Sequence, residues 1–185
     1  MKFKQFFTIP NLLCYVRIAL IPYFIYTYLQ AEQTMDYLYT ALLLAIMELT
    51  DLLDGYIARH YHMITEVGKI LDPIADKLLQ LTLLILLVYH YPLAVIVLIL
   101  FLIKETGMTI CGLITIRKKC KLDGALWCGK VSTTVFYICM VLLILFPSIK
   151  QPFANILLTI TAAFLLYSFI IYMKTYYKML KRDNC

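Results

Sequence analysis

The chain has 185 residues, of which 63% are hydrophobic and 15% are charged, and its mean hydropathy is +0.83. Soluble domains carry about 25% charged residues, so this composition excludes an ordinary soluble domain and indicates an integral membrane protein. The formal net charge of +6 is concentrated in short segments beside apolar runs. This pattern favours contact with membrane lipids or an anionic substrate, and not with nucleic acid.

Six apolar runs follow one another along the chain, each about 20 residues long, the length that crosses roughly 30 Å of hydrocarbon. They cover approximately residues 11–31, 36–59, 70–90, 92–116, 126–146 and 153–175. The predicted fold is an all-α integral membrane bundle of six transmembrane helices, with residues 1–185 forming a single membrane domain. No small-residue cleavage site follows the first apolar run, so this run is expected to be a retained helix and not a signal peptide.

Basic residues gather on one side of the predicted bundle. They lie before the first run, between the second and third, between the fourth and fifth, and after the sixth: Lys2, Lys4, Arg59, Lys69, Arg117, Lys118, Lys119, Lys121, Lys130, Lys174, Lys178, Lys181 and Arg182. The opposite loops carry one basic residue, Lys150, together with Glu32 and Asp36. The positive-inside rule therefore predicts that both termini are cytoplasmic.

The six cysteines form no C-x-x-C pair and have no histidine at a metal-ligand spacing. A structural zinc site or disulfide is therefore not expected. Thiols in apolar runs or at cytoplasmic ends stay reduced and pack as small hydrophobic side chains.

Acidic residues within the predicted helices are the main anomaly of the sequence, because ionisable groups at membrane depth are costly and usually functional. Asp51 and Asp54 are three residues apart, and Asp72 and Asp76 are four apart, so each pair projects from one face of a helix. Four carboxylates close together repel unless cations bind between them. An all-oxygen ligand set suits Mg²⁺ or Mn²⁺, and two ions are predicted.

Two such ions at a membrane surface suggest chemistry on a diphosphate, whose charge they would neutralise. Arg59 would add a cation with bidentate geometry for a phosphate oxygen. Gly55 would let a ligand approach the backbone, and Pro73 suits a helix start or break. Asp76 is the predicted general base, because one carboxylate of a two-metal set can keep an oxygen free to accept a hydroxyl proton.

The residues from Asp51 to Asp76 resemble the signature D-x-x-D-G-x-x-A-R-x8-G-x-x-x-D-x-x-x-D of the CDP-alcohol phosphatidyltransferases, with every interval kept. The resemblance implies a six-helix membrane enzyme, usually a homodimer, that transfers a phosphatidyl group from a CDP-linked lipid to an alcohol and releases CMP. It implies a polar cavity that opens to the cytoplasm. By position, it implies metal ligands at Asp51, Asp54, Asp72 and Asp76, a base at Asp76, and CDP contacts at Asp51, Gly55, Ala58, Arg59 and Gly68.

Two subgroups of this family are most similar, namely bacterial phosphatidylglycerophosphate synthases and the cardiolipin synthases of the same family. The segment IPNLLCYVRIALIP (9–22) resembles their I-P-N-x-L-T-x-x-R-x-x-x-x-P start, with Cys14 where threonine is common. Asn11 and Arg17 are therefore candidate cavity residues, although a helix-start asparagine and a snorkelling arginine explain them equally well.

The acceptor is predicted from two further segments, IKETGMTICG (103–112) and WCGKVSTTVFY (127–137), which resemble I-R-E-x-x-x-T-x-L-R and G-K-x-K-T of phosphatidylglycerophosphate synthases. Lys104, Arg117 and Lys130 are the candidate acceptor-binding residues. Gly112 and Ser132 stand where basic residues are expected, which weakens the case for an acceptor that carries its own phosphate. Glycerol 3-phosphate is the favoured acceptor, and phosphatidylglycerol or another alcohol is the alternative.

Two other classes place aspartates in membrane helices. Intramembrane prenyltransferases need about nine spans and lack the D-G-x-x-A-R core, so the length of this chain decides against them. A divalent-cation transporter would line a path through the bilayer with polar groups, whereas the acids here cluster near the predicted cytoplasmic ends. The prediction is therefore a phospholipid synthase of the bacterial cytoplasmic membrane that uses CDP-diacylglycerol, with its active site facing the cytoplasm.

Overall fold

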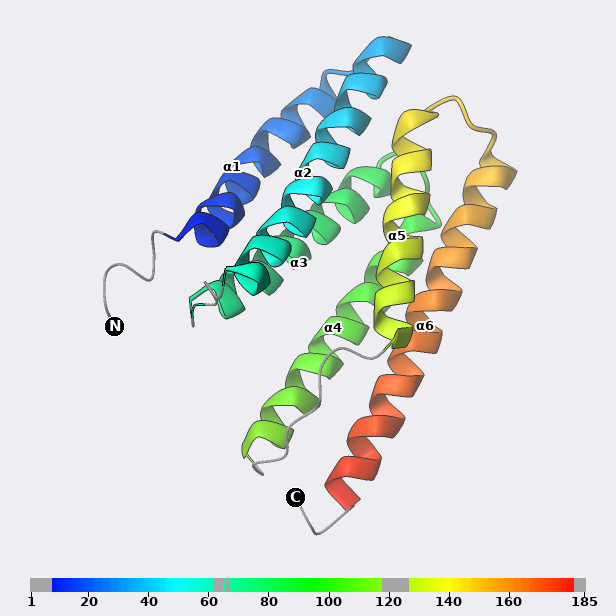
Figure 1. Cartoon of the computed structure of the whole chain (residues 1–185). Coiled ribbons are helices and arrows are strands. Elements are labelled where there is room, and N and C mark those ends of the chain that lie inside the picture. The colour runs from blue at the N-terminus through cyan, green and yellow to red at the C-terminus, as the bar shows by residue number, and fades with distance from the viewer. Residues whose placement is uncertain (1–7, 62–64, 66, 118–126, 182–185) are drawn as a thin grey trace. The chain divides into compact units, whose positions relative to one another are not determined.

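A computed structural model describes residues 8–61, 65, 67–117 and 127–181. Within these ranges the regular structure is helical, and no strand occurs. Figure 1 shows the six helices, which are α1 (Ile9–Leu29), α2 (Thr34–His60), α3 (Gly68–Val88), α4 (Ala94–Arg117), α5 (Trp127–Leu145) and α6 (Gln151–Lys181). The predicted all-α class is confirmed. Each helix matches one predicted apolar run to within two residues at either end, except that α6 extends to Lys181, six residues past the predicted end.

Four of these helices are long and apolar enough to cross a membrane: α1, α4 over Ala94–Thr115, α5, and α6 over Gln151–Met179. Helices α2 and α3 have 27 and 21 residues, which at about 1.5 Å per residue also reaches the thickness of the hydrocarbon core. These two helices carry the acidic pairs, which lower their hydropathy. Membrane spanning by α2 and α3 therefore stays a prediction, as does the location of the termini.

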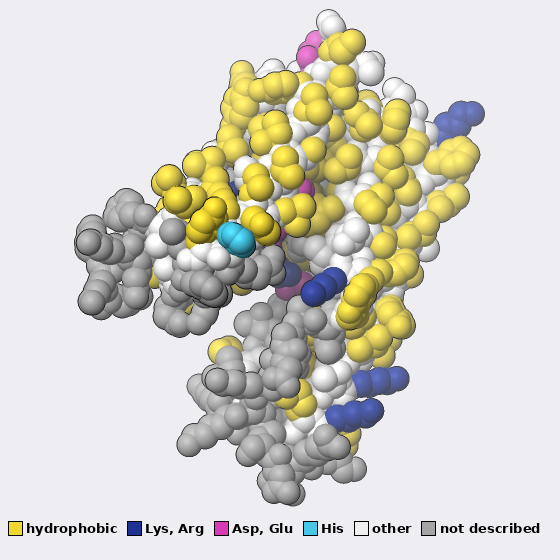
Figure 2. Space-filling model, in the orientation of Figure 1, with side chains coloured by type: hydrophobic (Ala, Val, Ile, Leu, Met, Phe, Trp, Pro, Cys, Tyr) yellow, Lys and Arg dark blue, Asp and Glu magenta, His cyan; other side chains and the backbone are white. Residues whose placement is uncertain are grey.

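Large hydrophobic side chains cover much of the molecular surface, as the face in Figure 2 shows. Every helix exposes such side chains, among them Leu12, Leu52, Ile85, Ile99, Ile138 and Ile160. Soluble proteins rarely expose apolar surface on this scale, because water makes it costly. A hydrocarbon environment removes that cost, so the surface agrees with a membrane location.

The chain divides into two compact units. The first comprises residues 1–86 and 141–148, and the second comprises residues 87–140 and 149–185. In the first unit α1 packs along α2, and in the second α4 packs along α6. Buried side chains such as Phe24, Leu44 and Leu83 lie in the first unit, and Phe101 and Phe136 stack in the second with ring centroids 6.3 Å apart.

Local signals explain where the helices of the first unit begin. Pro10 lies in the first turn of α1, where its missing N–H is not needed. A capping box starts α2, because Asp36 Oδ2 accepts the N–H of Gln33 at 2.9 Å. The structure corrects the expectation of a helix start or break at Pro73: α3 begins at Gly68, whose N–H is accepted by Thr65 Oγ1 at 2.9 Å, and runs through Pro73.

Glycine lets helices of the second unit approach one another. A Cβ added at Gly129 of α5 would lie 2.5 Å from Tyr172 Oη and 2.9 Å from Cε2 of the same ring, on α6. Tyr172 is buried, so the ring has little room to retreat. At Gly112 of α4, by contrast, an added Cβ would lie 3.7 Å from Tyr176 Oη, which is an ordinary contact.

Gly129→Ala should therefore destabilise the second unit, by about 1–3 kcal/mol, as overpacking in a filled interior does. The matched control is Gly112→Ala, which should be neutral or stabilising by up to about 1 kcal/mol, because alanine is the better helix former. Thermal unfolding in detergent of the two variants measures the difference. Equal unfolding midpoints for the two variants would contradict this account of the α5 and α6 contact.

Candidate functional site

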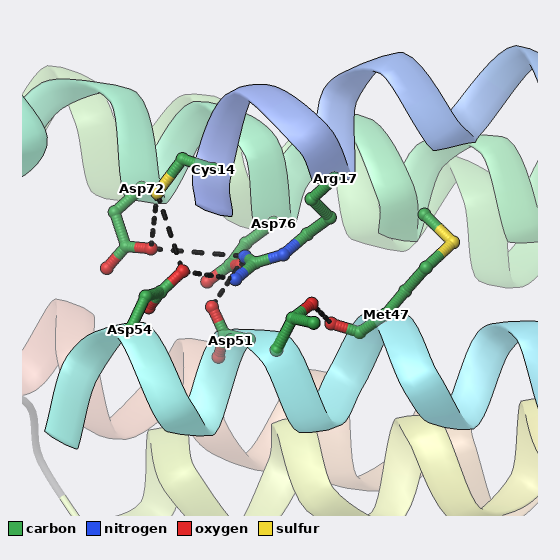
Figure 3. A network of polar contacts seen from close by, with 8 residues as sticks. Cys14, Arg17, Met47, Asp51, Asp54, Asp72 and Asp76 are labelled. Carbon is green, nitrogen blue, oxygen red and sulfur yellow. Dashed lines mark hydrogen bonds and ion pairs between the residues drawn. The ribbon is translucent and has the colours of Figure 1, made fainter. Parts of the chain in front are cut away.

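Charged side chains from three helices of the first unit meet at one place (Figure 3). Asp51 and Asp54 come from α2, Asp72 and Asp76 come from α3, and Arg17 comes from α1. The helical spacings explain this convergence, because residues three or four apart share one face of a helix. The predicted meeting of the two acidic pairs is confirmed.

The guanidinium group of Arg17 is the centre of this carboxylate cluster. Its Nη1 donates to Asp51 Oδ1 at 2.5 Å and to Asp76 Oδ1 at 2.8 Å, and lies 3.9 Å from Asp72 Oδ1. Its Nη2 donates to Asp54 Oδ2 at 2.7 Å. The planar guanidinium suits this arrangement, because its fixed donors point in several directions at once.

The cluster is buried on one side and open on the other. The side chain of Arg17 is 1% exposed and that of Asp54 is 3% exposed, whereas Asp51, Asp76 and Asp72 are 30%, 37% and 44% exposed. A ligand can therefore reach Asp51, Asp72 and Asp76, while Asp54 lies behind them. With all four carboxylates ionised, the guanidinium balances only one of four negative charges.

Cys14 is a further member of this site. Its Sγ lies 3.5 Å from Asp54 Oδ2 and 3.7 Å from Asp72 Oδ1, and its side chain is buried. Cys14 is a free, buried thiol, as expected for a cysteine in an apolar run, and it also contacts the carboxylates, which the sequence did not predict. Sequence reasoning had a usable signal, because Cys14 is three residues before Arg17 and so lies on the same face of α1.

The donor groups fit a divalent metal. Asp51, Asp72 and Asp76 each offer a carboxylate oxygen, and these atoms lie within 4.8 Å of one another. Cys14, Asp54 and Asp72 form a second group of this kind. Ligand oxygens around Mg²⁺ lie about 2.0–2.1 Å from the ion, so oxygens on opposite sides of it are roughly 4 Å apart. The carboxylate oxygens of Asp51, Asp72 and Asp76 are close to that spacing, whereas the second group includes the Cys14 sulfur, which is a poor ligand for Mg²⁺.

Gly68, at the start of α3, packs closely against Asn11 of α1. An added Cβ would lie 2.6 Å from Asn11 Oδ1 and 3.0 Å from Thr65 Oγ1. Asn11 is 1% exposed, and its amide group contacts the Thr65 hydroxyl, with Nδ2 at 3.1 Å and Oδ1 at 3.2 Å. Asn11 therefore lies next to the start of α3, and a side chain larger than that of Gly68 would collide with it. The sequence did not reveal this contact.

The remaining residues predicted to contact CDP lie on α2. Gly55 and Ala58 are half-buried and follow Asp54 along the helix. Arg59 belongs to the last turn of α2, but its side chain lies outside the part that the structure describes. The roles of these three residues stay predictions.

The predicted acceptor residues belong to the second unit. Lys104 is 6% exposed, and its Nζ lies 3.3 Å from Glu105 Oε1. Lys130 is exposed in the first turn of α5. Arg117 ends α4, and its side chain is outside the described residues. Participation of these residues in the site therefore stays a prediction.

Comparison with known proteins identifies the family. The sequence profile described as CDP-alcohol phosphatidyltransferase matches residues 7–175. The chain belongs to this family. The predicted enzyme class is thereby confirmed, and the prenyltransferase and cation-transporter alternatives are set aside.

Individual relatives carry a more specific name. Proteins called CDP-diacylglycerol–glycerol-3-phosphate 3-phosphatidyltransferase in Escherichia coli strain K12 and in Salmonella paratyphi A are each 30% identical over 178 residues, which cover 90% of this chain and 93% of each relative. A protein of the same name in Rickettsia bellii is 48% identical over 71 residues, or 38% of this chain and 39% of that relative.

Gly68→Ala should displace either the Asn11 amide or the first turn of α3, and so lower stability by about 1–3 kcal/mol. Asn11→Ala removes the atom that the new Cβ would meet. In an Asn11→Ala background, the added cost of Gly68→Ala should fall by at least half, as a double-mutant cycle on thermal unfolding would measure. Additive effects of the two substitutions would show that the contact does not restrict residue 68.

Proposed function

We propose that this member of the family is a phospholipid synthase that transfers the phosphatidyl group of CDP-diacylglycerol to glycerol 3-phosphate and releases CMP. The observation that carries the proposal is the convergence of Asp51, Asp54, Asp72 and Asp76, the four acidic positions of the family signature, around one point. Relatives whose alignments cover 90% of the chain bear the name of this reaction, which supports glycerol 3-phosphate as the acceptor.

The four aspartates would hold two divalent ions, Mg²⁺ or Mn²⁺, through their carboxylate oxygens. When bound, such ions neutralise the diphosphate of the donor and stabilise the phosphate that leaves with CMP. Arg59 would contribute a fixed positive charge to the same diphosphate. Asp51, Gly55, Ala58, Arg59 and Gly68 would contact the CDP portion.

Asp76 would act as the general base. Its side chain is 37% exposed, and its Oδ1 accepts a hydrogen bond from Arg17, so a substrate hydroxyl can approach this carboxylate. The acceptor hydroxyl would give its proton to Asp76, and its oxygen would attack the phosphorus bonded to the lipid. The bond from that phosphorus to the bridging oxygen then breaks, and CMP leaves with the bonding electrons.

Direct transfer is preferred to a phosphatidyl-enzyme intermediate. Cys14 is a thiol that contacts the carboxylate cluster, and it is 2% exposed. A nucleophile must reach the phosphorus at about 3–3.5 Å before bond formation, and the burial of Cys14 opposes that approach. Asp76 is better placed because its carboxylate is open to a ligand.

The charge distribution supports an orientation in the membrane. The acidic pairs lie near the last turns of α2 and the first turns of α3, next to the segment with Arg59 and Lys69. By the positive-inside rule, this end would be cytoplasmic, both termini would be cytoplasmic, and all six helices would span the bilayer. We expect a homodimer in the bacterial cytoplasmic membrane, as the family resemblance implies.

Phosphatidylglycerol is the second candidate acceptor, which would make the enzyme a cardiolipin synthase. The observation in its favour is the loss of two basic positions, which are Gly112 and Ser132 in this chain. Ser132 is 1% exposed, and its hydroxyl has no hydrogen-bond partner among the described residues. A less charged acceptor would need fewer cations here. Lys104 and Lys130, with Arg117, would serve the phosphate of either acceptor.

Asp76→Asn should reduce CMP release by a factor of about 10²–10⁴, the usual contribution of a general base. Binding of CDP-diacylglycerol should change much less, because three carboxylates of the cluster remain. Glu32→Gln is the matched control, since it removes an exposed carboxylate elsewhere in the first unit, and it should keep full activity. A fully active Asp76→Asn enzyme would remove the assigned base.

A panel of acceptors tests the substrate. Purified protein with CDP-diacylglycerol should release CMP with glycerol 3-phosphate, and release at least about tenfold less with phosphatidylglycerol, inositol, inositol phosphate, serine or glycerol. This ratio corresponds to about 1.4 kcal/mol of transition-state discrimination. A chelator should stop the reaction, and added Mg²⁺ or Mn²⁺ should restore it. Turnover with phosphatidylglycerol alone would establish the second candidate.

A further inference from the structure

The position of Arg17 coincides with the position that the carboxylates offer to a cation. Its Nη1 contacts Asp51 and Asp76 at 2.5 and 2.8 Å and lies 3.9 Å from Asp72. The same three residues form one of the two groups whose donor atoms lie within 4.8 Å of one another. In Figure 3 the guanidinium lies between the side chains of α2 and α3.

The guanidinium also contacts the second group, which consists of Cys14, Asp54 and Asp72, through its other terminal nitrogen. Arg17 Nη2 donates to Asp54 Oδ2 at 2.7 Å, and the same oxygen accepts from Cys14 Sγ. A Mg²⁺ ion bound by carboxylate oxygens of this cluster would lie about 2.0–2.1 Å from each of them. An ion held between these carboxylates would share that space with the guanidinium, and two cations repel at such short separations. Arg17 and a divalent ion therefore compete for the space between the carboxylates.

We propose that Arg17 is an internal counter-cation that competes with the divalent metal for the carboxylate cluster. This inference rests on the proposed metal site. In the metal-free protein the guanidinium holds Asp51, Asp54 and Asp76 together, and metal binding displaces it from at least two of these contacts. Arg17 is thus a positioning residue whose presence weakens metal affinity and stabilises the empty cluster.

The attachment of Arg17 permits such an exchange. Its Nε is buried and has no hydrogen-bond partner among the described residues, so the group is fixed only through its terminal nitrogens. All of the partners of those nitrogens are the carboxylates for which a metal competes. Losing them to a metal leaves no other hydrogen bond of this side chain to break.

The net charge of the site would differ between the metal-free and the metal-bound protein. Four carboxylates and one guanidinium carry a formal charge of three negative units, which would repel an anionic diphosphate. Two divalent ions add four positive units, so the site would then carry one positive unit. A guanidinium released from the carboxylates remains on α1 beside them and adds to the attraction for a phosphate group.

Mn²⁺ affinity tests this inference. The full-length protein is purified in detergent and stripped of metal, and free Mn²⁺ is titrated by electron paramagnetic resonance for wild type, Arg17→Gln, Arg17→Lys and Lys150→Gln. Lys150→Gln is the control, because it removes an exposed positive charge outside the cluster. We expect Arg17→Gln to lower the Mn²⁺ Kd at least about fivefold, or about 1 kcal/mol, with Lys150→Gln unchanged. The Mn²⁺ Kd of Arg17→Lys should lie between the values of wild type and Arg17→Gln, because an ammonium group cannot bridge the carboxylates as a guanidinium does.

Thermal unfolding provides a second readout. Without metal, Arg17→Gln should unfold at a lower temperature than wild type, and saturating Mn²⁺ should raise its midpoint by more than that of wild type, because the free energy of metal binding adds to stability. If Arg17→Gln does not fold, Arg17→Lys decides the question through the Mn²⁺ titration alone.

The outcomes separate this inference from the proposed function. A purely structural salt bridge predicts the opposite sign, because its loss would disorder the carboxylates and weaken Mn²⁺ binding. Unchanged or weaker Mn²⁺ binding by both Arg17 variants, with tight binding by wild type, would overturn the inference and leave the metal site standing. If wild type itself binds no Mn²⁺, then the proposed metal site fails and the inference fails with it.

Discussion

The buried guanidinium of Arg17 joins the three helices that build the site. Its partners lie on α2 and α3, and its own backbone lies on α1. Moving an ion out of water costs several kcal/mol unless charged partners surround it. Arg17 can therefore be buried only where the aspartates are, and the aspartates can be close together only where a cation is. This mutual dependence fixes the register of α1 against α2 and α3.

The rest of the first unit follows from that constraint. Helix α2 turns Asp51 and Asp54 toward Arg17 and exposes Leu52 and Leu53. The acidic residues make α2 less hydrophobic overall than α4 and α6. Its outer face is nevertheless apolar and suited to lipid. Close approach of α1 to the start of α3 completes the arrangement, because Gly68 leaves room for the Asn11 amide.

The second unit has a different balance of forces. Its helices pack through glycine and aromatic contacts, as Gly107 does against Phe169 and Gly129 against Tyr172. Its buried Lys104 pairs locally with the neighbouring Glu105, whose Oε1 lies 3.3 Å from Lys104 Nζ. The residues that are proposed to act on the donor lie in the first unit, and those that are proposed to select the acceptor lie in the second.

Sequence alone determined the helical class, the family, and the helix bounds to within two residues, apart from the end of α6. These features depend on local information: apolar runs of membrane-spanning length, and carboxylates at intervals of three and four that share one helix face. The same intervals predicted that Asp51, Asp54, Asp72 and Asp76 converge. Pro73 was misjudged because local propensity marks it as a breaker, whereas the first turn of α3 forms before it and is held by Thr65.

The tertiary structure decided what the carboxylates contact. Arg17 and Cys14 lie more than 30 residues before the first aspartate of the cluster, Asp51. A snorkelling arginine was an equally good interpretation of Arg17, and the sequence suggested only packing for Cys14. Only the packing of α1 beside α2 brings their side chains to within 2.5–3.9 Å of the acids. Local patterns report which face of a helix a residue occupies, but they do not report which other helix that face meets. That partnership is a property of the folded bundle, and here it places a cation of the chain where a metal is proposed to bind.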